Sequence, residues 1–223
     1  SAVFTLHSGN WLSNAKSNTT FEIGNGGSTA ISRSYKALRI NNRIINDIDK
    51  APLTPEQKNE ILGQAYFYRS WFYFQIIKRY GGMPIIDKVF EGGDDDIPRV
   101  TYHESHDWMM EDIQKAIYML PDSWDDPNYG RPTKIAAMAL KEWAQLFDAS
   151  PLMQNDLNST ENKGYDTERA KSAAKSAYEV IRYMDGSKSA PYPYGLASKE
   201  EYTNVFYFKY PPVHQPEYIW VKR

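Results

Sequence analysis

The sequence predicts an all-α fold of tetratricopeptide-like antiparallel helical pairs with long loops between some of them. Apolar residues recur at helical spacing in five stretches between residues 29 and 185. Most of these stretches open on a threonine or aspartate that suits a helix N-cap. The last two begin near Thr133 and Thr167, 34 residues apart, which is the tetratricopeptide period. Helices of similar length that follow one another in this way favour antiparallel packing.

Composition divides the chain into three segments. Residues 1–28 are rich in Ser, Asn, Thr and Gly and hold no helical period, so we expect a loop there. Residues 29–185 form the expected helical core. Residues 186–223 are rich in Pro and Tyr, and we expect mainly loop with one short helix near residues 199–205.

The first helix is expected to begin near Thr29. Its apolar stripe consists of Ile31, Tyr35, Leu38, Ile45 and Ile48. Asn42 interrupts this stripe with a polar side chain. Because buried polar groups are almost always satisfied, we expect the Asn42 side chain to form a hydrogen bond with the backbone.

The second helix carries the clearest start and stop signals. Thr54 and Gln57 predict a capping box, Pro55 suits the first helical position, and Gly81 is expected to end the helix in the left-handed conformation. The aromatic residues of this helix are Tyr66, Phe67, Tyr68, Trp71, Phe72, Tyr73, Phe74 and Tyr80. A helix that is apolar nearly all round must be wrapped by other elements, so we expect most of these rings in the core.

Three further helices are expected to follow. The third opens on a capping box of Thr101 and Glu104. Its expected buried face is Met109, Ile113, Ala116, Ile117 and Leu120. The fourth lies between Thr133 and Pro151, with the expected buried face Ile135, Ala136, Ala139, Leu140, Trp143, Leu146 and Phe147. The fifth follows Asp166, with the expected buried face Ala170, Ala173, Ala174, Ala177, Tyr178 and Ile181.

Composition excludes several classes of function. The 26 basic and 28 acidic side chains give a net charge of −2, so the sequence predicts no nucleic-acid partner. The chain has no cysteine, which excludes disulfides, thiolate metal sites and a cysteine nucleophile. The sequence contains no run of about eighteen apolar residues, so it predicts no membrane span.

Motifs for catalysis are also missing, and we expect a binding protein with no enzyme activity, cofactor or metal. The sequence carries no zinc-protease, nucleophile-elbow or phosphate-loop motif. His103 and His106 are three residues apart at a helix start, but without a third ligand a solvated first turn is the expected reading. Asp94, Asp95 and Asp96 lack the alternating ligands of a calcium loop and are expected to form a solvated acidic loop.

The second helix also carries a more specific pattern. From Gly63 to Pro84 the chain reads Gly-Gln-Ala, aromatics, Arg-Ser, further aromatics and Lys-Arg-Tyr-Gly-Gly-Met-Pro. This string resembles the signature helix of the SusD/RagB family. Other segments resemble further motifs of that family in the family's order, namely residues 37–45, 97–121, 130–152 and 216–220.

The resemblance implies a cell-surface lipoprotein of Bacteroidetes that captures a nutrient oligomer at the outer membrane. It implies delivery of an oligosaccharide to a TonB-dependent, SusC-like transporter, against which the tetratricopeptide-type helices pack. Family members are more than twice as long and carry a signal peptide and a lipid-bearing cysteine. We therefore expect residues 1–223 to be the N-terminal helical part of a larger SusD-like fold, lipid-anchored in the full-length protein.

The expected ligand site lies in the loop-rich segment 1–28. Sugar binding requires flat apolar faces and a few planar polar groups. SusD-like glycan binders carry a tryptophan with an asparagine three residues on, and Trp11 and Asn14 match that spacing. Asn10 and His7 are the neighbouring candidates. The alternative is that Trp11 fills the core beneath a loop, and Asn14 then has no ligand to contact.

Two other functions stay open at this point. One is a family member that captures peptides, which relies more on backbone hydrogen bonds and mixed pockets than on exposed rings. The other is a helical-repeat scaffold that binds protein and no small ligand. A second aromatic cluster would serve either packing or transporter contact, and consists of Tyr192, Tyr194, Tyr202, Tyr207 and Tyr210.

Overall fold

A computed structural model of the chain describes residues 30–90, 92, 96–154, 163–187, 194–207 and 216–221. Its helices are α3 (Ala30–Asp47), α4 (Pro55–Tyr80), α5 (Tyr102–Met119), α6 (Lys134–Asp148), α7 (Thr167–Gly186) and α8 (Tyr202–Tyr207). Short 3-10 turns lie at Ile48–Lys50, Asp126–Asn128 and Pro151–Met153. The described residues form no strand, so the all-α prediction is confirmed.

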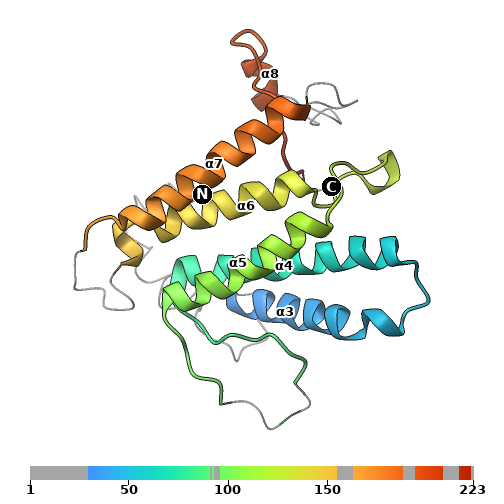
Figure 1. Cartoon of the computed structure of the whole chain (residues 1–223), viewed down its shortest axis with the longest axis vertical. Helices are drawn as coiled ribbons and strands as arrows, with labels where there is room; N and C mark the ends of the chain where they lie inside the picture. The colour runs from blue at the N-terminus through green and yellow to red at the C-terminus, as the bar shows by residue number, and fades with distance from the viewer. Residues whose placement is uncertain are drawn as a thin grey trace.

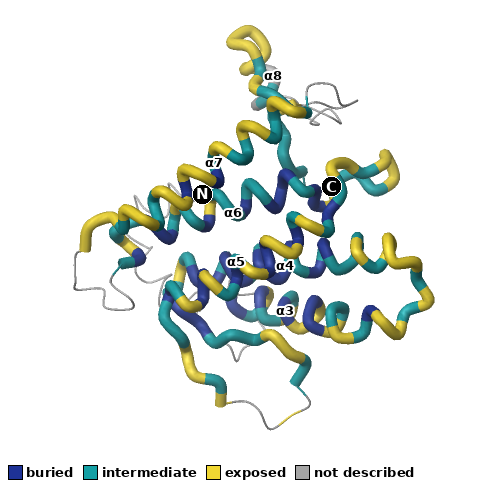
Figure 2. The backbone as a smooth tube through the Cα atoms, in the orientation of Figure 1, coloured by how far each residue is buried: buried dark blue, intermediate teal, exposed yellow. Residues whose placement is uncertain are grey.

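The long helices are stacked in their order along the chain (Figure 1). Each runs antiparallel to the one before it, with α3 at one end of the stack and α7 at the other. The main packing partners are α3 with α4, α4 with α5, α5 with α6, and α6 with α7. Buried residues concentrate where α4 meets α3 and α5, as Figure 2 shows. This is the arrangement expected of antiparallel helical pairs.

The predicted helix starts are confirmed in atomic detail. Thr54 Oγ1 accepts a hydrogen bond from Gln57 N at 3.3 Å, and Gln57 Oε1 accepts one from Thr54 N at 3.1 Å. The second capping box joins Thr101 and Glu104 in the same way. Gly81 ends α4 with φ 74°, the positive value that favours glycine, but its ψ of −160° lies outside the left-handed helical region. The expected left-handed cap is therefore correct in φ and wrong in ψ.

The aromatic rings of α4 are less uniformly buried than the sequence predicts. Phe67, Tyr73 and Phe74 are buried, whereas the other five aromatic residues of the helix are half-buried. Among the described elements, α4 packs mainly against α3 and α5 and much less against α6, so it is not enclosed on every side.

Five residues expected in the core are exposed instead, namely Ala174 and four larger side chains. On α6, Trp143 is 40% and Leu146 is 56% exposed. On α7, Tyr178 is 61% and Ile181 is 56% exposed. Among the described elements α7 packs mainly on α6, so only the narrow stripe of Ala173 and Ser176 is buried. Apolar periodicity predicts which face of a helix can be buried, but it does not show whether another element covers that face.

A buried ion pair joins α4 to α5. Arg69 donates from Nε to Asp112 Oδ2 at 2.5 Å and from Nη2 to Asp112 Oδ1 at 2.8 Å. Arg69 is 4% and Asp112 is 1% exposed. The guanidinium also lies over the rings of Tyr66 and Trp108, at 5.4 and 5.2 Å from their centres. This bidentate geometry is the strong form of a charge-assisted hydrogen bond.

Asn42 of α3 extends the same network, and its predicted backbone bonds are confirmed. Its Nδ2 donates to Ile86 O and to Lys88 O, each at 3.0 Å. Its Oδ1 accepts from Arg69 Nη1 at 2.8 Å. One asparagine therefore ties α3 to the ion pair and to the loop that follows α4.

The loop between α4 and α5 is closed by a tight backbone contact at Gly82. A Cβ atom on Gly82 would lie 2.0 Å from Val100 O and 2.4 Å from Thr101 C. Arg99 fastens the contact, because its Nε donates to Gly82 O at 2.8 Å and its Nη2 donates to Tyr80 O at 2.6 Å. Arg99 thus holds the end of α4 against the start of α5. The backbones approach so closely at residue 82 that only glycine fits there.

Candidate functional site

The predicted ligand residues His7, Asn10, Trp11 and Asn14 lie outside the described residues. Their role therefore stays a prediction. The acidic residues Asp94 and Asp95 also lie outside the described residues. The candidate site lies where aromatic rings gather in the described part of the chain.

Aromatic rings gather between α4 and α6 in what we call the aromatic seam. It consists of Phe67, Trp71 and Phe74 of α4, Trp143 of α6, and Trp220 near the C-terminus. The Trp143 ring lies edge-on to Phe74 at 5.0 Å and tilted to Trp71 at 6.0 Å between centres. Trp220 lies edge-on to Trp71 and to Phe67, each at 5.1 Å. These are the offset geometries that aromatic rings prefer.

Trp220 of the seam is held in place by a hydrogen bond to a residue 90 positions earlier in the chain. Trp220 Nε1 donates to Gly130 O at 3.0 Å. The neighbouring Trp124 Nε1 donates to Pro132 O at 2.8 Å. Gly130 has φ 97°, so this loop needs glycine to place its carbonyl against the indole. The sequence motifs at residues 130–134 and 216–220 thus meet at one point, which their separate positions did not reveal.

A lysine lies beside the exposed ring of the seam. Lys78 Nζ is 4.2 Å from the centre of the Trp143 ring and 5.0 Å from that of Phe74. Burial lowers the pKa of Lys78, and the neighbouring Arg79 lowers it further. Because the Lys78 ammonium lies over the Trp143 ring, a cation–π contact stabilises the orientation of that ring.

The seam has the chemistry of a carbohydrate-contacting surface. Trp143 is the exposed ring of the seam at 40%, and its neighbours Trp71 and Phe74 on α4 hold it in one orientation. A rigid indole offers a flat apolar face with little entropy left to lose on binding. Such a face can stack on the C–H surface of a sugar ring, and the adjacent Lys78 supplies a hydrogen-bond donor.

The two histidines do not form a solvated first turn, so that expectation is wrong. His103 Nδ1 lies 2.8 Å from Asp148 Oδ1, and His106 is buried. They belong to a charged junction of His103, His106 and Asp107 on α5, Asp148 on α6 and Arg169 on α7. Arg169 Nη1 bonds to Asp148 Oδ2 and lies 3.2 Å from Asp107 Oδ1. The junction fixes α7 to α5 and α6, and no group of described residues is arranged to hold a metal ion.

The junction predicts a measurable dependence of stability on pH. The His106 ring, 3.0 Å away, and then the Arg169 guanidinium hold the pKa of Asp107 at about 2, below its ordinary value of 3.8. A carboxylate whose pKa is lower in the folded state stabilises the fold above its unfolded pKa, and this contribution is lost as the pH falls toward the folded value. The protein should therefore be more stable than Asp107→Asn at about pH 6, with a smaller difference at about pH 2. Urea unfolding of both proteins checks this, and a difference that grows on acidification would contradict it.

The second aromatic cluster is only partly described. Tyr194 is half-buried and Tyr202 is 54% exposed. The side chains of Tyr192, Tyr207 and Tyr210 lie outside the description, so the role predicted for this cluster is untested. No described helix combines the length and the apolar character that crossing a membrane requires.

Comparison with known proteins gave one family. Residues 2–142 match the model of a SusD-like family described as "Starch-binding associating with outer membrane". A curated relative, SusD-like protein P38 of Formosa agariphila, is 28% identical over 102 residues, which are 45% of this chain and 20% of the relative.

Solved structures of SusD-like proteins share the fold. A SusD-like protein from Bacteroides fragilis aligns over 79% of this chain and 30% of its own, with a TM-score of 0.62 and 30% identity. A laminarin-binding SusD-like protein aligns over 81% of this chain and 35% of its own, with a TM-score of 0.62 and 19% identity. The chain therefore spans between 20% and 35% of the length of these relatives.

Proposed function

The chain belongs to the SusD-like family, and from that premise we propose that it is part of an outer-membrane protein that captures oligosaccharide at the cell surface. The observation that carries this proposal is the match of residues 2–142 to a family described as starch-binding. The aromatic seam supports it, because Trp143 offers an oriented, exposed indole face. A structural neighbour with the same fold binds laminarin, and that ligand also presents sugar C–H surfaces.

The finer parts of the proposal rest on the family. The protein is lipid-anchored in its full-length form and delivers its ligand to a TonB-dependent, SusC-like transporter. It binds the glycan without cleaving it. Capture of peptide in place of glycan, or of protein partners alone, would appear as different outcomes of the experiment below.

The test is a binding screen of the full-length protein against soluble polysaccharides and peptide mixtures. Trp143→Ala should weaken binding of the selected glycan about tenfold, which is about 1.4 kcal/mol, because a stacking face is removed. Trp11→Ala tests the predicted N-terminal contact in the same assay. Affinity is measured by calorimetry, and thermal melting establishes that each variant is folded.

Tyr178→Ala on α7 is the control for loss of an exposed ring, since Tyr178 is 61% exposed and lies outside the seam. It should leave affinity unchanged. Binding of peptides and of no glycan would reject the carbohydrate proposal. A glycan that binds Trp143→Ala as tightly as the unaltered protein would reject the seam as its site.

A further inference from the structure

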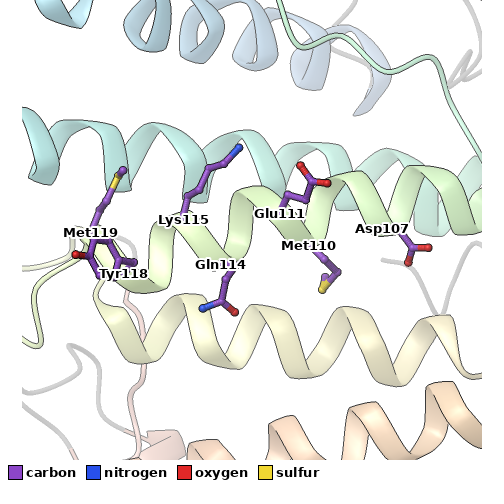
Figure 3. A pocket seen from close by; sticks show the side chains of 7 residues that line it. All are labelled: Asp107, Met110, Glu111, Gln114, Lys115, Tyr118 and Met119. Carbon is purple, nitrogen blue, oxygen red and sulfur yellow. The ribbon is translucent and has the colours of Figure 1, made fainter.

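A shallow groove of about 690 Å³ follows the outer side of α5. All of its lining residues come from this helix, and none belongs to the aromatic seam. Figure 3 shows Glu111, Lys115 and Met119 along the edge nearer α4, and Met110 and Gln114 along the edge nearer α6. Tyr118 lies at the same end as Met119 and is 84% exposed, more than any of the exposed residues discussed so far.

The charged groups of the groove are largely neutralised by partners within the protein. Asp107 lies 3.2 Å from the Arg169 guanidinium. Lys115 Nζ lies 3.6 Å from Asp112 Oδ1 and 5.1 Å from the centre of the Tyr66 ring. Only Glu111 adds a charge without an ion-pair partner among the described residues. The groove therefore has no strong field that would select a polyanion or a polycation.

The uncommitted groups are of the kinds that contact sugars. In the described part of the chain, the Glu111 carboxylate, the Gln114 amide and the Tyr118 hydroxyl form no hydrogen bond with other protein groups. They lie at positions i, i+3 and i+7, so they share one side of the helix over about 10 Å. A carboxylate and an amide can each bond to neighbouring sugar hydroxyls, while the tyrosine ring and the methionines offer apolar surface.

We propose that this groove is a second, weaker contact for a neutral glycan chain, with Tyr118 as its stacking face and Glu111 and Gln114 as its hydrogen-bonding groups. The proposal rests on the glycan-binding function proposed above and adds a separate surface to it. A polysaccharide long enough to reach both the primary site and α5 gains affinity from the second contact, because that contact is then intramolecular. A short oligosaccharide fills only one site and gains nothing.

The experiment compares chain lengths of the glycan selected in the screen. Calorimetry measures affinity of the full-length protein for the polysaccharide and for a short oligosaccharide of the same linkage. Tyr118→Ala should weaken polysaccharide binding about fivefold and leave oligosaccharide binding unchanged. Tyr118→Phe keeps the ring and should bind the polysaccharide nearly as the unaltered protein does.

The matched control is again Tyr178→Ala, another exposed tyrosine on a helix, which should change neither affinity. Equal polysaccharide affinity of Tyr118→Ala and the unaltered protein would overturn the inference while leaving the proposed function intact. An equal loss in Tyr178→Ala would overturn it as well, since the effect would then not belong to α5. Absence of glycan binding by the unaltered protein would reject the proposed function, and this second contact with it.

Discussion

Asp112→Ala is expected to lower the free energy of unfolding by about 3–5 kcal/mol, the cost of leaving a buried charge without its partner. The Arg69 side chain would keep its place in the core, because α4 positions it between the Tyr66 and Trp108 rings. Its bidentate bonds to Asp112 would be lost, while the bonds from Nη1 to Asn42 Oδ1 at 2.8 Å and to Asp87 O at 3.4 Å would remain. Urea unfolding monitored by tryptophan fluorescence measures the change.

Two further variants separate a charge effect from general damage. Asp49→Ala removes a surface partner of Lys58, and Asp49 is 94% exposed, so a loss below about 1 kcal/mol is expected. Arg69→Met combined with Asp112→Leu removes both charges and should recover much of the stability lost in Asp112→Ala. A double variant as unstable as the single one would show that packing, and not the unpaired charge, sets the cost.

Gly82→Ala is expected to destabilise the fold by at least about 3 kcal/mol, or to prevent folding, because backbone atoms occupy the space of the new methyl group. The contacts at 2.0 and 2.4 Å are to a carbonyl oxygen and a carbonyl carbon, neither of which can rotate away as a side chain would. Relief would require α5 to move from the end of α4. That movement would break the two bonds that Arg99 donates to Gly82 O and Tyr80 O.

Gly186→Ala is the matched control for this substitution. Gly186 ends α7, and a Cβ atom there would meet nothing within 4 Å. Alanine is the better helix former, so the change should be neutral or stabilising by up to about 1 kcal/mol. Thermal melting of the two variants gives the comparison, and similar losses at Gly82 and Gly186 would contradict the steric argument.

The helices were predictable because their signals are local. The capping boxes at Thr54 and Thr101 each lie within four residues, and both occur as expected. The position of Asn42 in an apolar stripe was enough to predict a backbone partner. Its partners, Ile86 and Lys88, are 44 and 46 residues away and could not be named from the pattern.

The site was less predictable because exposure depends on which neighbours a helix has. Trp143 and Leu146 share the period of the buried residues on α6, and only the positions of α4, α5 and α7 decide that they stay exposed. The charged junction was missed for a related reason. His103 and His106 show a local spacing of three, whereas Asp148 and Arg169 come from two later helices. The candidates His7, Asn10, Trp11 and Asn14 remain untested because they lie outside the described residues.

The bond between Trp220 and Gly130 has a consequence for how the chain folds. The contacts that unite α4 and α5 join residues closer along the chain, such as Arg69 and Asp112 at 43 positions and Gly63 and Leu120 at 57, against 90 for Trp220 and Gly130. Short-range contacts lose less chain entropy on closing and so form sooner. During synthesis, α3, α4 and α5 can therefore assemble while later residues are still being added. The aromatic seam is completed only when residue 220 is available, so until then Phe67 and Trp71 lack the Trp220 ring and expose apolar surface that chaperones recognise.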